Sequence, residues 1–138
     1  MIRLSIFDNY PTSRAGLRYT FCETPDIQIT GETGNGADLL QNLQQAPADI
    51  VVLGVNNNRK SKSFKTVRHV EITRKIRSKF PDVKILAYAN QETDKTVRQM
   101  MREGASGFIG QREANERELE RAIRQVAAGG TYVGQSDR

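Results

Sequence analysis

The chain has 138 residues, one cysteine and a formal net charge of +5. This length fits a single domain that buries roughly two thirds of its unfolded surface and needs no disulfides. No apolar run approaches the ~20 residues of a membrane span, and the N-terminus is too soon polar for a signal peptide. We therefore expect a cytoplasmic protein that does not contact a membrane. Cys22 is expected to be a buried, inert thiol on the apolar side of a helix with Leu17 and Phe21.

Apolar segments alternate with amphipathic segments five times along the chain, which predicts alternating strands and helices. Pro11 suits the first turn of a helix, Asn35 suits an N-cap, and Gly129-Gly130 ends the last helix. The expected strands are Ile2–Phe7, Ile27–Glu32, Ile50–Leu53, Val83–Tyr88 and Gly107–Ile109. The helices expected after each of them are Pro11–Thr24, Gly36–Gln45, roughly Lys65–Phe80, Glu92–Arg102 and Asn115–Ala128.

Strand–helix alternation with short links predicts an α/β fold with a doubly wound parallel sheet. Five such units predict a flavodoxin-like (βα)5 sandwich with a five-stranded sheet in the order 2-1-3-4-5. Residues 1–130 would form this domain, with a basic insertion at about 55–65, and residues 131–138 would begin a C-terminal linker or tail. In this fold a site is expected at the carboxyl ends of strands one and three.

Five segments carry more than the alternating pattern. They are Ile6-Phe7-Asp8-Asn9-Tyr10-Pro11, Pro25-Asp26-Ile27, Phe80-Pro81-Asp82-Val83, Gly104-Ala105-Ser106-Gly107-Phe108 and Ala127-Ala128-Gly129-Gly130-Thr131-Tyr132. In this order they resemble the receiver domains of response regulators of the NarL/FixJ (LuxR-type) family. Each segment alone is moderately specific, and their order makes the set strong. The resemblance covers nearly the whole chain except Val55 to about His69.

In that family an aspartate at the end of strand three accepts a phosphoryl group, helped by an acidic pair that holds Mg²⁺, a threonine or serine, and a lysine. Here Gly54 stands in the place of the nucleophile, and the acidic pair is reduced to Asp8 and Asn9. The remaining positions of the pocket are Ala89 for the threonine, Gln111 for the lysine and Phe108 for the aromatic switch. The resemblance thus implies a degenerate phosphorylation pocket with no metal and no cofactor.

Gly54 leaves space at the expected site, and two interpretations stay open. In the first, the chain itself fills the space, with neighbouring side chains such as Tyr10 or with the segment Asn56–Asn58. In the second, a small molecule binds at this switch point of the sheet. No dinucleotide or P-loop spacing of glycines is present.

Nine Lys/Arg residues and one acidic residue, Glu71, lie between Arg59 and Lys79. A solvated loop and outer helix face explain this stretch most simply. An acidic protein partner or an auxiliary contact with nucleic-acid phosphates is the alternative. His69 has no second ligand at metal spacing and is expected at the surface. The basic patch is Arg59, Lys60, Lys62, Lys65 and Arg68.

The combined expectation is a receiver domain that acts without phosphorylation as a regulatory and dimerising module, and not as an enzyme. The partners would be a second copy of the chain and another protein, with DNA contacted only through a C-terminal helix-turn-helix domain outside these residues. The last helix mixes charges of both signs, which suits a self-complementary contact or an ordinary solvated surface. The alternative is a stand-alone adaptor or ligand-sensing module that binds a protein or a small metabolite.

Overall fold

The computed structural model describes residues 1–55, 62–89, 94–110 and 116–133, and for residues 55, 62–68, 89, 94–97 and 116 the backbone alone is described. The strands are β1 (Ile2–Phe7), β2 (Ile27–Thr33), β3 (Ile50–Val55), β4 (Lys84–Ala89), β5 (Gly107–Gly110) and β6 (Tyr132–Val133). The helices are α1 (Pro11–Phe21), α2 (Gly36–Gln45), α3 (Lys62–Lys79), α4 (Asp94–Arg102) and α5 (Glu116–Ala127).

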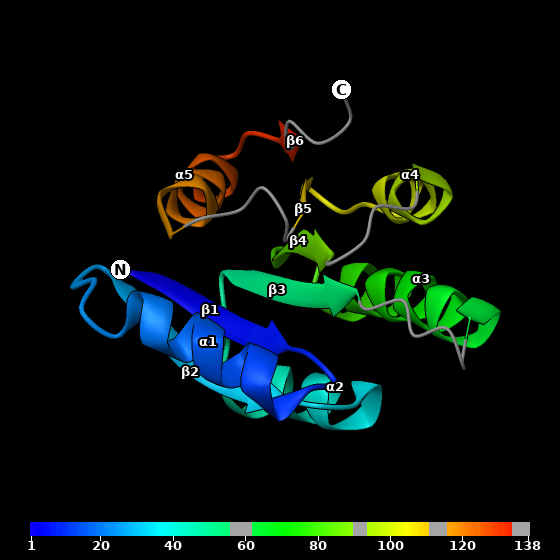
Figure 1. Ribbon diagram of the computed structural model, residues 1–138. Coiled ribbons are helices and arrows are strands. Elements are labelled where there is room, and N and C mark those ends of the chain that lie inside the picture. The colour runs from blue at the N-terminus through cyan, green and yellow to red at the C-terminus, as the bar shows by residue number, and fades with distance from the viewer. Residues whose placement is uncertain (56–61, 90–93, 111–115, 134–138) are drawn as a thin grey trace.

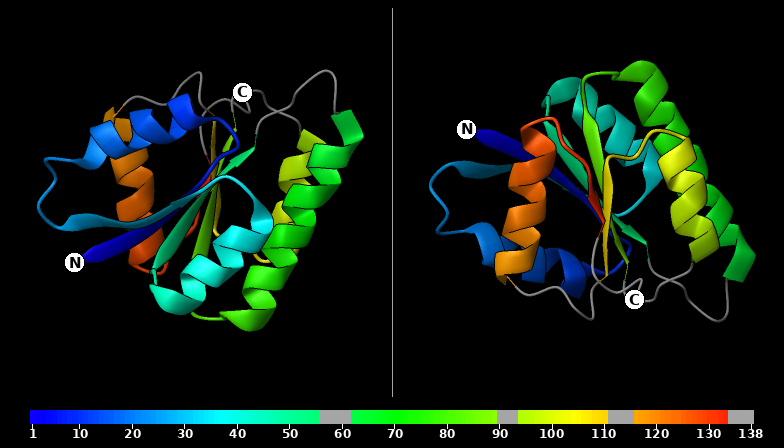
Figure 2. Two further views of the ribbon diagram at one scale, coloured as in Figure 1. Left: turned by 90° about the horizontal axis from the view of Figure 1, so that it is seen from below. Right: turned by 90° about the horizontal axis from the view of Figure 1, so that it is seen from above.

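The strands form one parallel sheet in the order β2-β1-β3-β4-β5-β6. Helices α1 and α5 cover one face of this sheet, and α2, α3 and α4 cover the other (Figures 1 and 2). Val51 and Leu53 of β3 face one buried cluster, while Ile50 and Val52 face the second, as strand geometry requires. The expected flavodoxin-like, doubly wound architecture is confirmed.

The sheet has six strands rather than the predicted five, because Tyr132–Val133 pairs in parallel with the outer edge of β5. Gly107 lies opposite Tyr132, and a Cβ at Gly107 would come within 2.6 Å of the Tyr132 carbonyl oxygen. The missing side chain therefore permits the close approach of the last strand. A strand of two residues is too short to show an alternating pattern, so its sequence does not predict it.

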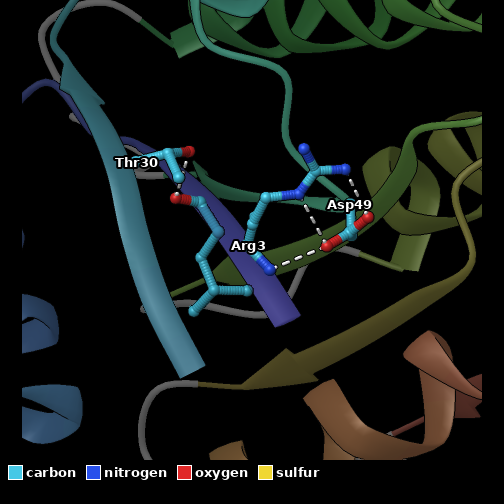
Figure 3. Close-up of polar contacts among 4 residues, drawn as sticks. Arg3, Thr30 and Asp49 are labelled. Carbon is cyan, nitrogen blue, oxygen red and sulfur yellow. Dashed lines mark hydrogen bonds and ion pairs between the residues drawn. The ribbon is translucent and has the colours of Figure 1, made fainter. Parts of the chain in front are cut away.

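The amino ends of the central strands are joined by a fork-shaped contact between Arg3 and Asp49 (Figure 3). The backbone N–H and Nε of Arg3 both donate to Asp49 Oδ2, at 2.8 and 3.2 Å, and a terminal guanidinium nitrogen donates to Oδ1 at 3.0 Å. These hydrogen bonds hold the pKa of Asp49 below its usual value. Thr30 of β2 donates to the Leu4 carbonyl on the other side of β1. The contacts lie at the end of the sheet opposite the expected site.

The prediction that Cys22 is buried is wrong, because its side chain is exposed. Helix α1 ends at Phe21 rather than at Thr24, and Cys22 is its C-cap. Leu17 and Phe21, four residues apart, share the buried face, whereas a residue five positions after Leu17 points well away from it.

The prediction that His69 lies at the surface is also wrong, since its side chain is only 2% exposed. On α3 it precedes Ile72 and Ile76 by three and seven residues, so it shares their inner face. Its ring meets Phe7 edge to face, with ring centroids 6.0 Å apart.

No helix among the described residues is long and apolar enough to cross a lipid bilayer.

Candidate functional site at the carboxyl ends of the strands

Asp8 and Gly54 meet where β1 and β3 end. The two strands run side by side with Phe7 opposite Leu53, so the next residue of each lies at the same edge of the sheet. Asp8 is fully buried, and Gly54 is buried as well. Asp8 follows the apolar residues Ile6 and Phe7, and its carboxyl group is held out of water at this point.

The Asp8 carboxylate occupies the space beside Gly54. A Cβ at Gly54 would lie 2.9 Å from Asp8 Cγ, closer still to Oδ2, and 3.1 Å from the Phe7 carbonyl oxygen. Real Cβ atoms essentially never approach other atoms as closely as the two Asp8 distances, and the distance to Phe7 is also unusually short. The neighbour that fills the space is therefore Asp8 rather than Tyr10, whose side chain is 36% exposed. The segment Asn56–Asn58, the other predicted neighbour, lies outside the described residues.

Hydrogen bonds fix Asp8 in this place. Its Oδ1 accepts from the backbone N–H of Tyr10 at 2.9 Å, which closes a tight turn into α1. Its backbone N–H donates to the Thr33 carbonyl at 3.1 Å, and its carbonyl accepts from the Arg14 guanidinium at 2.6 Å. The side chain and backbone of Asp8 are thus both anchored, and the carboxylate lies against Gly54 as part of the turn.

Asn9 turns away from Asp8. Its amide nitrogen donates to the Gly34 carbonyl at 2.9 Å, in the link between β2 and α2. A magnesium site needs several converging oxygen ligands, preferably carboxylates. Here one carboxylate is partly used by a turn, the neighbouring amide is directed to another loop, and Gly54 has no side chain. These residues do not fit a Mg²⁺ site, and no cluster of three His, Cys, Asp or Glu side chains occurs among the described residues.

Tyr88 is a member of this site that the sequence does not single out. It pairs with Gly54 across β3 and β4, and its side chain is partly buried against the cluster beneath α1 and α5. Burial, and secondarily the negative charge of Asp8, raise the pKa of the Tyr88 hydroxyl. Only the parallel register of β3 and β4 places Tyr88 beside Gly54, which is why a reading of the sequence alone passes over it.

The structure describes only some of the remaining predicted pocket residues. Ala89 ends β4 opposite Val55, although its side chain lies outside the described atoms. Phe108 is 4% exposed and packs into the cluster beneath α2, α3 and α4. It lies next to Ala87 on one side and Val133 on the other. Gln111 lies outside the described residues, so the structure does not bring it to the site.

The predicted basic patch is described only at its backbone. Arg59 and Lys60 lie outside the described residues, whereas Lys62, Lys65 and Arg68 belong to the first half of α3 without described side chains. The second half of α3 is described in full. There Arg74 pairs with Glu103 at 3.1 Å, and Arg77 donates to the carbonyls of Pro81 and Val83.

Comparison with known proteins shows relatives among bacterial regulators, although no family model matches the chain. The chain is 30% identical to the transcriptional regulatory protein YxjL of Bacillus subtilis, over 93% of this chain and 55% of that protein. It is 24% identical to the transcriptional regulatory protein DegU of Brevibacillus brevis, over 96% and 52%. It is 27% identical to the response regulator GacA of Pseudomonas aeruginosa, over 96% and 58%. The chain therefore spans about half the length of the curated relatives it matches.

Solved structures with the same fold come from response regulators. The isolated REC domain of RcsB from Salmonella enterica serovar Typhimurium, in its apo form, matches with a TM-score of 0.84 and 15% identity, covering 99% of this chain and 95% of that one. A LuxR-family two-component response regulator from an Aurantimonas species matches with a TM-score of 0.81 and 21% identity, covering 97% and 90%. These likenesses establish the fold.

Proposed function

We propose that this chain, a receiver domain of the LuxR/NarL-type response regulators, acts as a regulatory and dimerising module. We propose that it is not phosphorylated at position 54, where the resemblance places the phosphoryl acceptor. The observation that carries the proposal is the contact between Asp8 and Gly54. The strand end that would supply the nucleophile has no side chain, and a buried carboxylate already lies against it. We propose further that the module works in the cytoplasm and catalyses no reaction.

The chemistry supports this proposal. An acyl phosphate forms only on a carboxylate that attacks an electrophile held in line, with its charge neutralised by cations. Gly54 offers no nucleophile, and the carboxylate of Asp8 is fully buried and tied to the Tyr10 N–H. A ligand shifts the equilibrium between two conformations only when it binds one of them more tightly. Since no phosphoryl group would be bound at position 54, the packing of the domain would set its working conformation.

The test uses a phosphoryl donor and its mimic. Acetyl phosphate or beryllofluoride is added with Mg²⁺ to the ¹⁵N-labelled chain, and backbone amide shifts are recorded together with the intact mass. We expect unchanged amide shifts and no mass increase of a phosphoryl group. A different receiver domain, with an aspartate at the position equivalent to Gly54, is the positive control that shows that the reagents react. A phosphoryl adduct, or Mg²⁺-dependent shifts across several elements, would contradict the proposal.

We propose that the second copy of the chain binds through the outer side of α1. There Tyr19 is 77% exposed, and the space beside Gly16 is open. The arginines of α5 are less available, because Arg121 and Arg124 already form ion pairs within the chain. Light scattering over a concentration series, without a phosphoryl donor, should show a dimer that dissociates on dilution. A monomer at every concentration would exclude this part of the proposal.

The relatives bear on the wider role of the chain. Their names describe transcriptional regulators, and the chain matches about half of each of them. We propose that the module serves such a regulator, in which a separate helix-turn-helix domain contacts DNA. The coding sequence that follows Arg138 tests this directly: a helix-turn-helix there supports it, whereas a stop codon favours a stand-alone adaptor.

A further inference from the structure

The basic side chains of the two helical layers differ in how they are neutralised. On the layer of α1 and α5, ion pairs involve most of the described arginines: Arg18–Glu32, Arg121–Glu118, Arg124–Asp26 and Arg124–Glu120. On the opposite layer, an ion pair joins Arg74 of α3 to Glu103, just after α4. In contrast, Lys75, Lys79 and Arg102 form no ion pair with any described residue. These three side chains are exposed to solvent.

The exposed basic side chains of this layer lie on two neighbouring helices. Helices α3 and α4 pack side by side on the same face of the sheet (Figure 2). A groove of about 330 Å³ runs between them, with Arg74 and Glu103 on its wall beside Arg102. Residues 69–80 and 98–103 together contain six Lys/Arg and two glutamates. We name as the α3–α4 surface the exposed cations Arg74, Lys75, Lys79, Arg98 and Arg102.

Helix α3 is long on the scale of a nucleic-acid duplex. With 18 residues it spans about 27 Å. A duplex carries one phosphate charge per ~1.7 Å of its axis, so several phosphates lie along a length of this order, and lysine and arginine bind them by charge alone. Glu71 and Glu103 also line the groove, but Glu103 is neutralised by Arg74. A polyanion would then contact the long side chains at the rim of the groove.

The surface lacks the apolar residues that anchor protein partners. Protein interfaces depend on a few buried aromatic or aliphatic side chains near their centre. Among the described residues, the large apolar side chains that are exposed are Met1, Tyr10, Tyr19 and Val133, and none of them belongs to α3 or α4. Contact with a phosphate backbone needs no such anchor. The absence of anchors among the described side chains of these two helices favours nucleic acid over an acidic protein.

We propose that the α3–α4 surface binds the phosphate backbone of double-stranded nucleic acid without reading its sequence. The described helices already pack against the sheet, and the binding residues are flexible cations on their outer side. Such contacts position a protein on a duplex and do not specify bases. The proposal is independent of phosphorylation, because it uses no residue at the carboxyl ends of the strands.

The experiment measures binding of the 138-residue chain to a fluorescent DNA duplex of about 20 base pairs and mixed sequence, by anisotropy, over a range of salt concentrations. Three or more phosphate contacts predict a slope of about −3 for the logarithm of affinity against the logarithm of salt concentration, or roughly 60-fold weaker binding from 50 to 200 mM salt. The variant Lys75→Gln/Lys79→Gln/Arg102→Gln should lose nearly all of this slope. Two unrelated duplex sequences should bind equally well.

The matched control removes the same charge from the other layer. The variant Arg18→Gln/Arg117→Gln/Arg121→Gln should keep most of the affinity and the slope, while circular dichroism checks that both variants fold. Absence of binding at low salt would overturn the proposal, and so would an equal loss in both variants. Tighter binding to a polyglutamate peptide than to the duplex would assign the surface to an acidic protein instead. Failure here leaves the phosphorylation test unaffected, because the two experiments use different sites.

Discussion

The carboxylate of Asp8 lies against the bare Cα of Gly54, in the space that any other residue at position 54 would need for its side chain. The two residues come from neighbouring strands and are forty-six positions apart in the sequence. Asp8 is fully buried, and a turn hydrogen bond to Tyr10 keeps it there. The absence of a side chain at Gly54 is therefore a packing requirement of this chain.

Gly54→Ala should destabilise the domain, because its methyl group would overlap Asp8. Overpacking of this kind costs about 1–3 kcal/mol, measurable by urea denaturation. In an Asp8→Ala background the same substitution should cost clearly less, since the overlapping group is gone. Gly16→Ala on the open side of α1 is the control and should be neutral or slightly stabilising. Equal costs of Gly54→Ala in both backgrounds would contradict the direct contact.

Gly54→Asp should make the domain dependent on a cation. A second carboxylate beside buried Asp8 adds charge repulsion, which Mg²⁺ would relieve. At a tenfold excess of Mg²⁺ over its dissociation constant, the variant should gain about 1.4 kcal/mol, while the natural chain gains none. Gly54→Asn has a similar volume without the charge and should not respond. Thermal unfolding with and without Mg²⁺ measures the difference, and stabilisation of the natural chain would refute the proposed loss of the metal site.

Gly107→Ala should release β6 from the sheet. The new methyl group would come within 2.6 Å of the Tyr132 carbonyl oxygen and 3.1 Å of Leu86. We expect faster amide hydrogen exchange in Tyr132–Val133 and a loss of about 1–3 kcal/mol in the free energy of unfolding. Exchange in β2, at the other edge, should stay unchanged and is the internal control. Retained protection of the last strand would show that its pairing tolerates a side chain here.

His69→Ala should cost about 1–3 kcal/mol of stability, as expected for removal of a buried side chain. The lost contacts include the edge-to-face packing on Phe7. Ser78→Ala, on the exposed side of the same helix, should change stability by less than about 0.5 kcal/mol. Chemical denaturation of the two variants compares them directly. Indistinguishable effects would place His69 at the surface after all.

Acid should weaken the domain from about pH 4 downwards. Hydrogen bonds from Arg3 and Arg124 hold the pKa values of Asp49 and Asp26 below the ordinary 3.8, and Arg74 does the same for Glu103. A carboxylate with a lowered folded pKa stabilises the fold above its ordinary pKa and loses that contribution as the pH falls through the folded value. Unfolding curves from about pH 7 to pH 2 should show this, and Asp49→Asn should flatten the acid limb. A variant as acid-sensitive as the natural chain would remove Asp49 from this account.

Local patterns were sufficient for the order and type of the elements. The apolar strand Ile50–Val55 and the capped helix Gly36–Gln45 were recognisable because their periodicity and end signals lie within a few residues. Gly54 could be singled out for the same reason, since it lies one residue before the end of a strand whose place in the fold follows from element order. The side of a helix on which a residue lies was less certain, as Cys22 and His69 show. If the predicted end of a helix is wrong by one or two residues, or its buried face is assigned to the wrong side, a single side chain is predicted as buried when it is exposed, or the reverse.

The sequence by itself determined that the chain forms a doubly wound sheet and that its third strand carries a glycine at position 54. The tertiary structure alone decided that Asp8 fills the place beside Gly54, that Tyr88 joins them, and that β6 extends the sheet along β5. The tertiary structure also decided which cations are paired and which face solvent. The physical reason is that strand and helix propensity act between near neighbours in the chain, whereas contacts such as Asp8 with Gly54 exist only once the strands are in register.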